Sequence, residues 1–478
     1  SLPLPSIPDS GDMFFDGSDQ NDAESESSVD ETRCTKLAVA ENISAFIEKR
    51  ALDREVEEIT CGSDLLENVM TNYVIAKEII SHLPWQEKFL CKHVCSMWHS
   101  AVQALQKEQL EPADFVMDLC INEPESHVEF KKSGNFYTEP LAVLTFANML
   151  GFSITIKCAA ISPNICSPAC ENAHCLIDVV QHKVCVPKDC MLTAKASYLC
   201  YMPLSQTPTY EHVYTPQMFV QSNPFISGIY IPLIPDVQFK IINIISFDDM
   251  QKDFFDVVHD ISQSNIIKGV IVYVTESYLL RSVEEIVFLN YFKDVQPNVP
   301  YALGGCIVED TIYEQKNIDL IVDRNNENID FVSENLVTIA LFTVPKESNM
   351  CNFDMYSLIV ESSDWAKAKI QKTIDEFAKK VPRFEHSVAV KLSCVGRDQK
   401  HEVEQDYFRA AFPRTRLIGC YGNGELGVNH PAKPPLEKMP SSVKRHRRDP
   451  GPQFGIMYSY STVFVYMGWG KRTPPESL

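Results

Sequence analysis

The most constraining stretch of the sequence is a near-continuous run of β-branched residues from Ile267 to Val274. Such a run is typical of a strand covered on both faces, because only a fully buried strand is apolar at nearly every position. Apolar residues at helical spacing follow between Leu279 and Tyr291, and a second strand-like segment runs from Tyr301 to Val308. This β-α-β order predicts an α/β fold, or a mixed α+β fold, in which helices flank the sheet.

The same alternation continues on both sides of this unit. Further strands are expected from their patterns at residues 152–158, 225–231, 237–245, 336–344, 355–360, 388–394 and 415–421. The last two strand-like segments, Phe454 to Tyr460 and Thr462 to Tyr466, are expected to form a hairpin. We therefore divide the body into two α/β parts, 120–310 and 335–470, which are candidates for distant structural relatives.

A short helical segment at residues 64–106 precedes this body. Apolar residues from Leu65 to Leu83 recur at helical spacing, and Pro84 ends the first helix. A broader apolar series from Phe89 to Leu105 predicts one or two further short helices. So small a unit buries too little surface to be stable alone, and we expect it to pack on a partner or on the next domain.

This helical segment contains Leu83-Pro84, Val94-Cys95 and Trp98. By the identity and spacing of these residues, the segment resembles an F-box, the helical module that binds the Skp1 adaptor of cullin-RING ubiquitin ligases. The resemblance implies an adaptor-facing surface formed by Tyr73, Ile80, Leu83, Pro84, Val94, Cys95 and Trp98. The chain departs from the F-box pattern at Tyr73-Val74, where Leu-Pro is usual, and at Lys88, where leucine is common. The alternative is an ordinary helical hairpin inside a larger domain.

Glycine-rich segments follow or interrupt the predicted strands of the body. Gly422, Gly424 and Gly427 have the spacing of a dinucleotide fingerprint, but Val428 to Pro431 does not open the helix that a pyrophosphate requires. A P-loop is excluded because the Lys-Ser/Thr pair is missing. We predict no cofactor.

Two further segments, Cys394 to Asp398 and Gly304-Gly305, lie at or near the ends of other predicted strands. Because α/β sheets bind ligands at strand ends, we expect these two segments and the glycine run after Ile418 to converge on one pocket.

The C-V-G-R run from Cys394 and the G-N-G-E-L-G run from Gly422 resemble the C-terminal part of FIST domains, and the L-G-G-C run from Leu303 resembles the end of their N-terminal part. FIST domains occur in bacterial sensory proteins and, in eukaryotes, behind an F-box. The resemblance implies a ligand or client surface formed by Gly304, Gly305, Cys394, Gly396, Arg397, Gly422, Asn423, Gly424 and Glu425.

The two resemblances together imply a non-catalytic substrate receptor of an SCF (Skp1-cullin-F-box) ubiquitin ligase. Its partners would be Skp1, cullin and a protein client. The alternative is a small-ligand sensor with a degenerate F-box. A thiol enzyme is a third hypothesis, since Arg397 is near Cys394, but no adjacent histidine is present to act as a base.

Charge and composition narrow the class of partner. A net charge of -21 and a pI of about 5.0 argue against binding to nucleic acid or to an anionic membrane. No apolar run approaches the ~20 residues that span a bilayer, and no signal peptide is evident, so we expect a soluble intracellular protein of the cytoplasm, with the nucleus as a further compartment. The acidic segment 1–35 is expected to be disordered, and the chain, which begins with Ser1, to be a fragment.

Two further segments are expected to be irregular. Seven of the 16 cysteines lie between Cys158 and Cys200, within an insertion at 158–215. We favour buried reduced thiols or an irregular loop there, with a tetrahedral zinc site as the alternative, and predict no metal. A basic run at 444–448 lies in a Pro-rich loop at 430–452. We favour a solvated loop there, with nuclear import or contact with an acidic partner as the alternatives.

Overall fold

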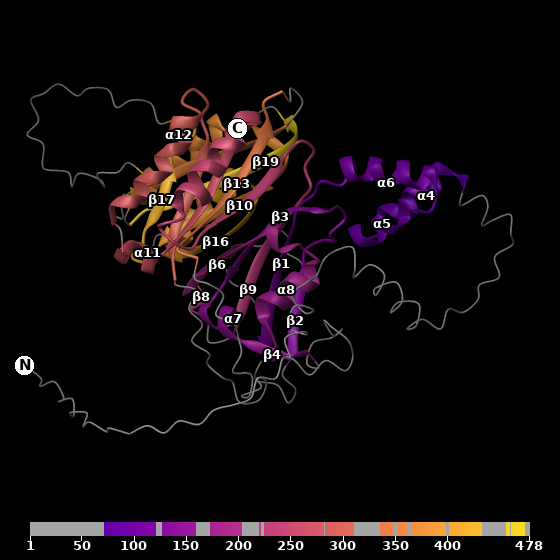
Figure 1. The fold of residues 1–478 in the computed structure, drawn as a ribbon, viewed down its shortest axis with the longest axis horizontal. Helices are drawn as coiled ribbons and strands as arrows, with labels where there is room; N and C mark the ends of the chain where they lie inside the picture. The colour runs from indigo at the N-terminus through magenta and orange to yellow at the C-terminus, as the bar shows by residue number, and fades with distance from the viewer. Residues whose placement is uncertain are drawn as a thin grey trace, which may run out of the picture.

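The computed structural model describes residues 71–120, 127–158, 173–202, 219–220, 224–281, 283–309, 335–347, 352–361, 365–397, 401–432, 456–458 and 460–473. These residues form a small helical module that projects from one side of a large body of mixed sheets and helices (Figure 1). The predicted α/β class is therefore confirmed. The predictions for residues 1–35 and for most of the loop 430–452 lie outside the described residues.

Three helices form the module: α4 (Tyr73–Ser81), α5 (Trp85–Cys91) and α6 (Ser96–Glu108). The side chain of Asn72 caps α4 by accepting hydrogen bonds from the backbone N–H groups of Val74 and Ile75. As expected, the first helix ends before Pro84, which lies at the N-cap of α5. A small core joins the helices: Ile80, Cys91, Ala101, Val102 and Leu105.

The body is built from three consecutive units that share one strand order. In each sheet the first strand of the unit lies beside the fourth, followed by the second and the third. The second and third strands are parallel, and the other neighbours within each unit are antiparallel. The strands are β1 (Ala113–Cys120), β3 (Pro140–Ala147), β6 (Met191–Lys195) and β9 (Phe225–Pro232) in unit one; β10 (Gln238–Ile244), β11 (Asn265–Thr275), β12 (Ala302–Val308) and β13 (Val337–Pro345) in unit two; β14 (Phe353–Val360), β15 (Arg383–Cys394), β16 (Arg416–Gly422) and β19 (Thr462–Thr473) in unit three.

Helices connect the parallel strands of every unit, as the β-α-β pattern predicts. Those crossovers contain α7 (Met149–Ser153) and α8 (Leu176–Val184) in unit one; α11 (Glu276–Arg281), the 3₁₀ segment η4 (Val283–Asn290) and α12 (Tyr291–Val295) in unit two; and α14 (His401–Ala411) in unit three. Between the first and second strands lie β2 (His127–Lys132) in unit one; the π-helical segment η3 (Gln251–Asp256) and α10 (Val257–Ser264) in unit two; and α13 (Lys367–Lys380) in unit three. The short pair β4 (Thr155–Lys157) and β5 (Ala173–Cys175) and the 3₁₀ turn η2 (Lys188–Cys190) complete unit one.

The units also exchange strands. From unit one, β7 (Tyr198–Met202) pairs with β16 of unit three and is followed by β8 (Phe219–Val220). From unit three, β17 (Glu425–Val428) pairs with β12 of unit two and then with β18 (Met457–Tyr458). The body thus divides differently from the two parts expected at 120–310 and 335–470, and no sheet boundary coincides with residues 310–335.

The expected terminal hairpin is wrong. The strand β18 adds to the edge of the unit-two sheet through β17, whereas β19 lies between β14 and β15 in the unit-three sheet. Local alternation located both segments but did not show that they belong to different sheets. Sequence neighbours usually pair in an antiparallel sheet, but here the exchange of strands between units prevents it.

Two six-stranded sheets, those of units two and three, pack face to face with helices on their outer sides. The inner core contains Ile271 and Ala340 from one sheet and Val390 and Val465 from the other. Helices α10 and α12 cover the outer face of the unit-two sheet, and α13 and α14 cover that of the unit-three sheet. None of the helices in the described ranges is long and apolar enough to cross a bilayer.

The two sheets approach closely where β12 carries glycine. A Cβ atom on Gly304 would lie 2.2 Å from the Val465 Cγ2 atom, far closer than atoms pack. We expect Gly304→Ala to lower the free energy of unfolding by about 1–3 kcal/mol, because the added methyl overpacks a core. Urea unfolding measures the change.

A matched control is Gly134→Ala, where the nearest atom to an added Cβ is 3.8 Å away. That variant should stay within about 0.5 kcal/mol of the wild type. Equal stability of the two variants would contradict the close packing of β12.

Candidate functional site

The helical module carries an unusual number of exposed apolar side chains. Val74 is 74% exposed, and Ile75, Ile79 and Val94 are 41–49% exposed. The apolar residues of α4 are distributed around the helix, but the small core of the module covers only one side of it. The exposed side chains of Tyr73, Val74, Ile75 and Ile79 on α4, and of Val94 after α5, are together called the apolar face.

The structure places the predicted adaptor residues unequally. Tyr73, Val94 and Cys95 are exposed, whereas Leu83 and Trp98 are half-buried against the module core. The placement of Ile80 on the adaptor surface is wrong, because its side chain is fully buried in that core. The helical spacing in the sequence identified the side of α4 that packs on the module core, not the side that faces solvent.

Sequence reasoning missed three members of the apolar face: Val74, Ile75 and Ile79. Their signal was present, since six of the nine residues of α4 are apolar and exceed what a single stripe requires. A stripe that wide predicts a second buried face. The small partner helices do not supply it.

The joint between module and body is built around α5. The Trp85 side chain is buried with Phe136 in the core of the unit-one sheet, and the Trp85 N–H donates to the Phe136 carbonyl at 2.9 Å. Lys88, which departs from the F-box pattern, is buried and donates from Nζ to the Tyr137 carbonyl at 3.0 Å. Burial lowers the pKa of Lys88 to about 8. Lys88 thus faces the body and not the apolar face.

The three glycine-containing segments of the body do lie close together. The Val395 N–H donates to the Gly422 carbonyl at 2.9 Å, and the Ile307 N–H donates to the Gly424 carbonyl at 2.9 Å. These bonds join the C-terminal ends of β12, β15 and β16, as expected for strand ends in α/β sheets. The contact among the three segments is therefore made by backbone atoms of the protein itself.

Three of these glycines allow close packing. Gly304 and Gly305 lie inside β12, where added Cβ atoms would meet Val465 and the Val272 carbonyl oxygen. A Cβ on Gly422 would lie 2.3 Å from the Ile307 carbonyl oxygen. Gly304, Gly305 and Gly422 are buried and line no described cavity, which corrects their assignment to a ligand surface.

Arg397 is a structural residue at the end of β15. Its side chain is fully buried, and its Nε donates to Glu404 Oε1 of α14 at 2.8 Å. Its Nη2 lies 2.6 Å from the same oxygen, and its Nη1 donates to the Tyr460 carbonyl. The other Glu404 oxygen accepts from Thr462 Oγ1 at 2.7 Å, so both charges are paired and hydrogen-bonded.

Glu425 is buried next to this ion pair. Its Oε2 accepts hydrogen bonds from the Ser461 N–H at 3.0 Å and from Ser461 Oγ at 2.8 Å. Burial raises the pKa of Glu425 to about 8, although the Ser461 bonds oppose the shift.

Cys394 contacts Glu425 at the end of β15, and its pKa is raised by burial and by the nearby carboxyl group. This direction is opposite to the one that a nucleophilic thiolate requires.

A small part of this region reaches solvent. Gly396, Asn423 and Tyr460 are exposed and Cys394 is half-buried, at the ends of β15 and β16. Sequence reasoning named all of these except Tyr460, whose φ of 53° marks a turn before β19. We call these four residues the strand-end surface.

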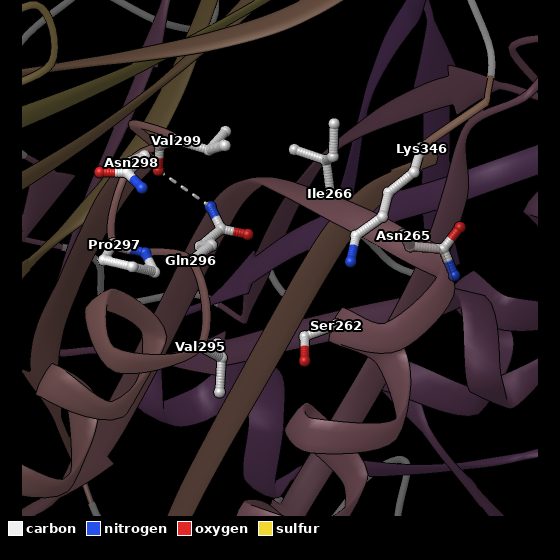
Figure 2. Close-up of a pocket in the computed structure, with 9 residues that line it drawn as sticks. All are labelled: Ser262, Asn265, Ile266, Val295, Gln296, Pro297, Asn298, Val299 and Lys346. Atoms are coloured by element: carbon white, nitrogen blue, oxygen red, sulfur yellow. Dashed lines mark hydrogen bonds between the residues drawn. The ribbon is translucent and has the colours of Figure 1, made fainter.

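The described cavity lies elsewhere, at the N-terminal end of β11. Its volume is about 190 Å³, and its lining includes Asn265, Ile266 and Lys346 on one side and Asn298 and Val299 on the other (Figure 2). The Gln296 amide donates to the Val299 and Ile267 carbonyls, so protein partners satisfy it. This volume is below the several hundred Å³ typical of small-molecule sites.

The described cysteines of unit one differ in burial. Cys158 and Cys200 are buried, Cys175 and Cys190 are half-buried and Cys185 is exposed. Among the residues whose placement is described, no group of three or more His, Cys, Asp or Glu side chains is arranged to hold a metal ion. Cys166 and Cys170 lie outside those residues.

Comparison with known proteins adds little to this geometry. No protein-family model matches the chain, and no curated protein matches it. Among solved structures, cyanuric acid hydrolase from A. caulinodans is similar over 75% of this chain and 99% of the hydrolase, with a TM-score of 0.30 and 6% sequence identity. A likeness of that size carries no inference about activity.

Buried Glu425 makes stability depend on pH. In the fold its pKa is about 8, against 4.5 for an ordinary glutamate, so the folded chain retains a proton that the unfolded chain loses between these values. We therefore expect Glu425 to lower the free energy of unfolding as pH rises from 5 to 8, by at most about 1.4 kcal/mol per pH unit. Glu425→Gln should remove this contribution, measured as a shallower pH dependence in urea unfolding.

Glu376→Gln, at an exposed position of α13, is the control and should keep the wild-type slope. Identical slopes in the wild type and Glu425→Gln would show that Glu425 is already ionised in the fold.

Proposed function

We propose that this chain is the substrate receptor of an SCF ubiquitin ligase, which docks on Skp1 through the helical module and captures client proteins with the body. The carrying observation is the apolar face. Five of the ten large apolar side chains that are exposed among the described residues lie in this three-helix module. Such a concentration of exposed apolar side chains in one small module is typical of a site of protein association.

The way the module is held supports the proposal. Trp85 and Lys88 attach α5 to the body, while the apolar face on α4 and at Val94 is left outside that contact. Trp469 Nε1 of β19 adds a hydrogen bond to the Leu110 carbonyl at 2.8 Å, just after α6. An adaptor can therefore bind α4 without separating the module from the body.

The body supports a capturing rather than a catalytic role. Arg397 and Glu404 satisfy one another, and burial raises the pKa of the Cys394 thiol. Neither arrangement supplies a charged group or a nucleophile to a substrate. We assign the client to the strand-end surface, and the complex to the cytoplasm.

The apolar face is tested with two charges. We expect Val74→Asp with Ile79→Lys to reduce co-purification of Skp1 and cullin by more than about tenfold, because buried charge at an interface without a partner is costly. An acidic residue near the start of a helix and a basic one near its end favour the helix, so α4 should stay folded. Quantitative immunoblotting of the purified chain measures the loss.

The matched control is Ile245→Asp, at a body position that is 48% exposed. It should leave Skp1 binding unchanged. Substitutions at Val74 and Ile79 test the surface more directly than substitutions at Leu83 and Trp98, because the latter two side chains also pack against the module core. If the wild type retains no Skp1, or the double variant retains all of it, the receptor proposal fails and a ligand sensor becomes the better hypothesis.

Clients are identified by affinity capture with the proteasome blocked. Proteins held by the body should be retained by the wild type and by the Val74→Asp, Ile79→Lys variant alike. They should carry ubiquitin only with the wild type, since the variant lacks the ligase. Ubiquitination that persists with the variant would contradict the assignment.

A further inference from the structure

Two thiols face each other between the central sheets of the body. Sγ of Cys306 on β12 and Sγ of Cys420 on β16 are 3.5 Å apart, and both side chains are fully buried. The residues are 114 positions apart in sequence and belong to different sheets. Two sulfur atoms at this distance require a movement of about 1.5 Å to reach the length of a disulfide bond.

The fold itself brings the pair together. β12 and β16 are the third strands of their units, and each cysteine lies two residues before the end of its strand. Gly304 and Gly422 share faces with Cys306 and Cys420, because residues two apart lie on one face of a strand. Gly422 packs its backbone against Cys306 Cβ, where an added Cβ would be 3.0 Å away. The two strands therefore meet closely at this point.

The surroundings keep the thiols reduced and unreactive in the closed fold. Both lie in the inner core among apolar side chains, with the Tyr273 hydroxyl beside them. That hydroxyl is buried and makes no hydrogen bond to any described residue. The pKa of Cys306 is raised by the bond to Cys420 and by burial, so little thiolate forms. Oxidation therefore requires the sheets to open, or takes place while the chain folds.

We propose that Cys306 and Cys420 form a redox-dependent disulfide that joins the two central sheets. The two thiols lose two electrons and two protons, and one low-molecular-weight disulfide such as oxidised glutathione accepts them and becomes two thiols. One sulfur–sulfur bond breaks and one forms. In a reducing compartment the pair stays free, which fits the rule that disulfides in such compartments report redox change.

The crosslink acts on the strand-end surface. The turn Gly422 to Gly424 begins two residues after Cys420, and the Asn423 N–H donates to the Ile307 carbonyl at 3.0 Å, one residue after Cys306. A bond between the two cysteines therefore fixes both strands at the base of this turn. The oxidised chain holds the turn more rigidly and resists separation of the sheets.

The test equilibrates the full chain, without oxygen, in glutathione buffers of increasing oxidised share and in urea below the unfolding transition. Free thiols are then alkylated, and a non-reducing digest is analysed by mass spectrometry. We expect a linked pair of Cys306 and Cys420 peptides that grows with the oxidised share. The midpoint of thermal unfolding should rise by several degrees with it, and amide exchange at 416–428 should slow.

Cys306→Ala should abolish the linked peptides and the rise in the unfolding midpoint. Cys200→Ser is the matched control, because Cys200 is also buried but lies near Lys391 and Gln405 on the other face of its sheet. It should behave like the wild type. Alkylation of both Cys306 and Cys420 at every buffer ratio, or linkage of either to another cysteine, overturns the proposal. Neither outcome depends on whether Skp1 binds.

Discussion

The close approach of two β-sheets is the constraint on which the rest of this structure depends. Gly304 in one sheet and Val465 in the other pack so tightly that a Cβ atom at the glycine would overlap the Val465 side chain. Gly269 packs against Met355 in the same way. The approach brings the ends of β12, β15 and β16 together, so that the short turn at 422–424 bonds to β12 and supports Glu425 beneath it. The glycines act by having no side chain, which permits this close approach.

Most strands of units two and three could be predicted from local pattern, whereas β1, β3 and β6 of unit one were not among the strands expected. Ile267 to Val274 was correctly identified as a doubly covered strand, since apolar residues at every position have no other common explanation. The threefold recurrence of one strand order could not, because it is a property of pairing between distant segments. Met457 shows the limit: its neighbours alternate like a hairpin strand, but it pairs with Leu426 in another sheet.

The candidate site shows the same division between local and distant information. The exposed ends of the strands, with Asn423 and Gly396, followed from the motifs. The burial of Arg397 did not, because its partner Glu404 lies on a helix whose position depends on the fold. An arginine near a cysteine resembles an activated thiol in sequence. In space the charge is neutralised by Glu404, and the thiol faces a carboxyl group.

The adaptor hypothesis concerns a surface that lies outside the joint between the helical module and the body. The apolar face is formed by α4 and by Val94, and the body holds the module through α5. Hydrogen–deuterium exchange of the full chain, with and without purified Skp1, tests this claim most directly. The account predicts slower exchange at residues 73–98 and unchanged exchange in the sheets of the body. Unchanged exchange throughout, or protection confined to the body, would contradict it.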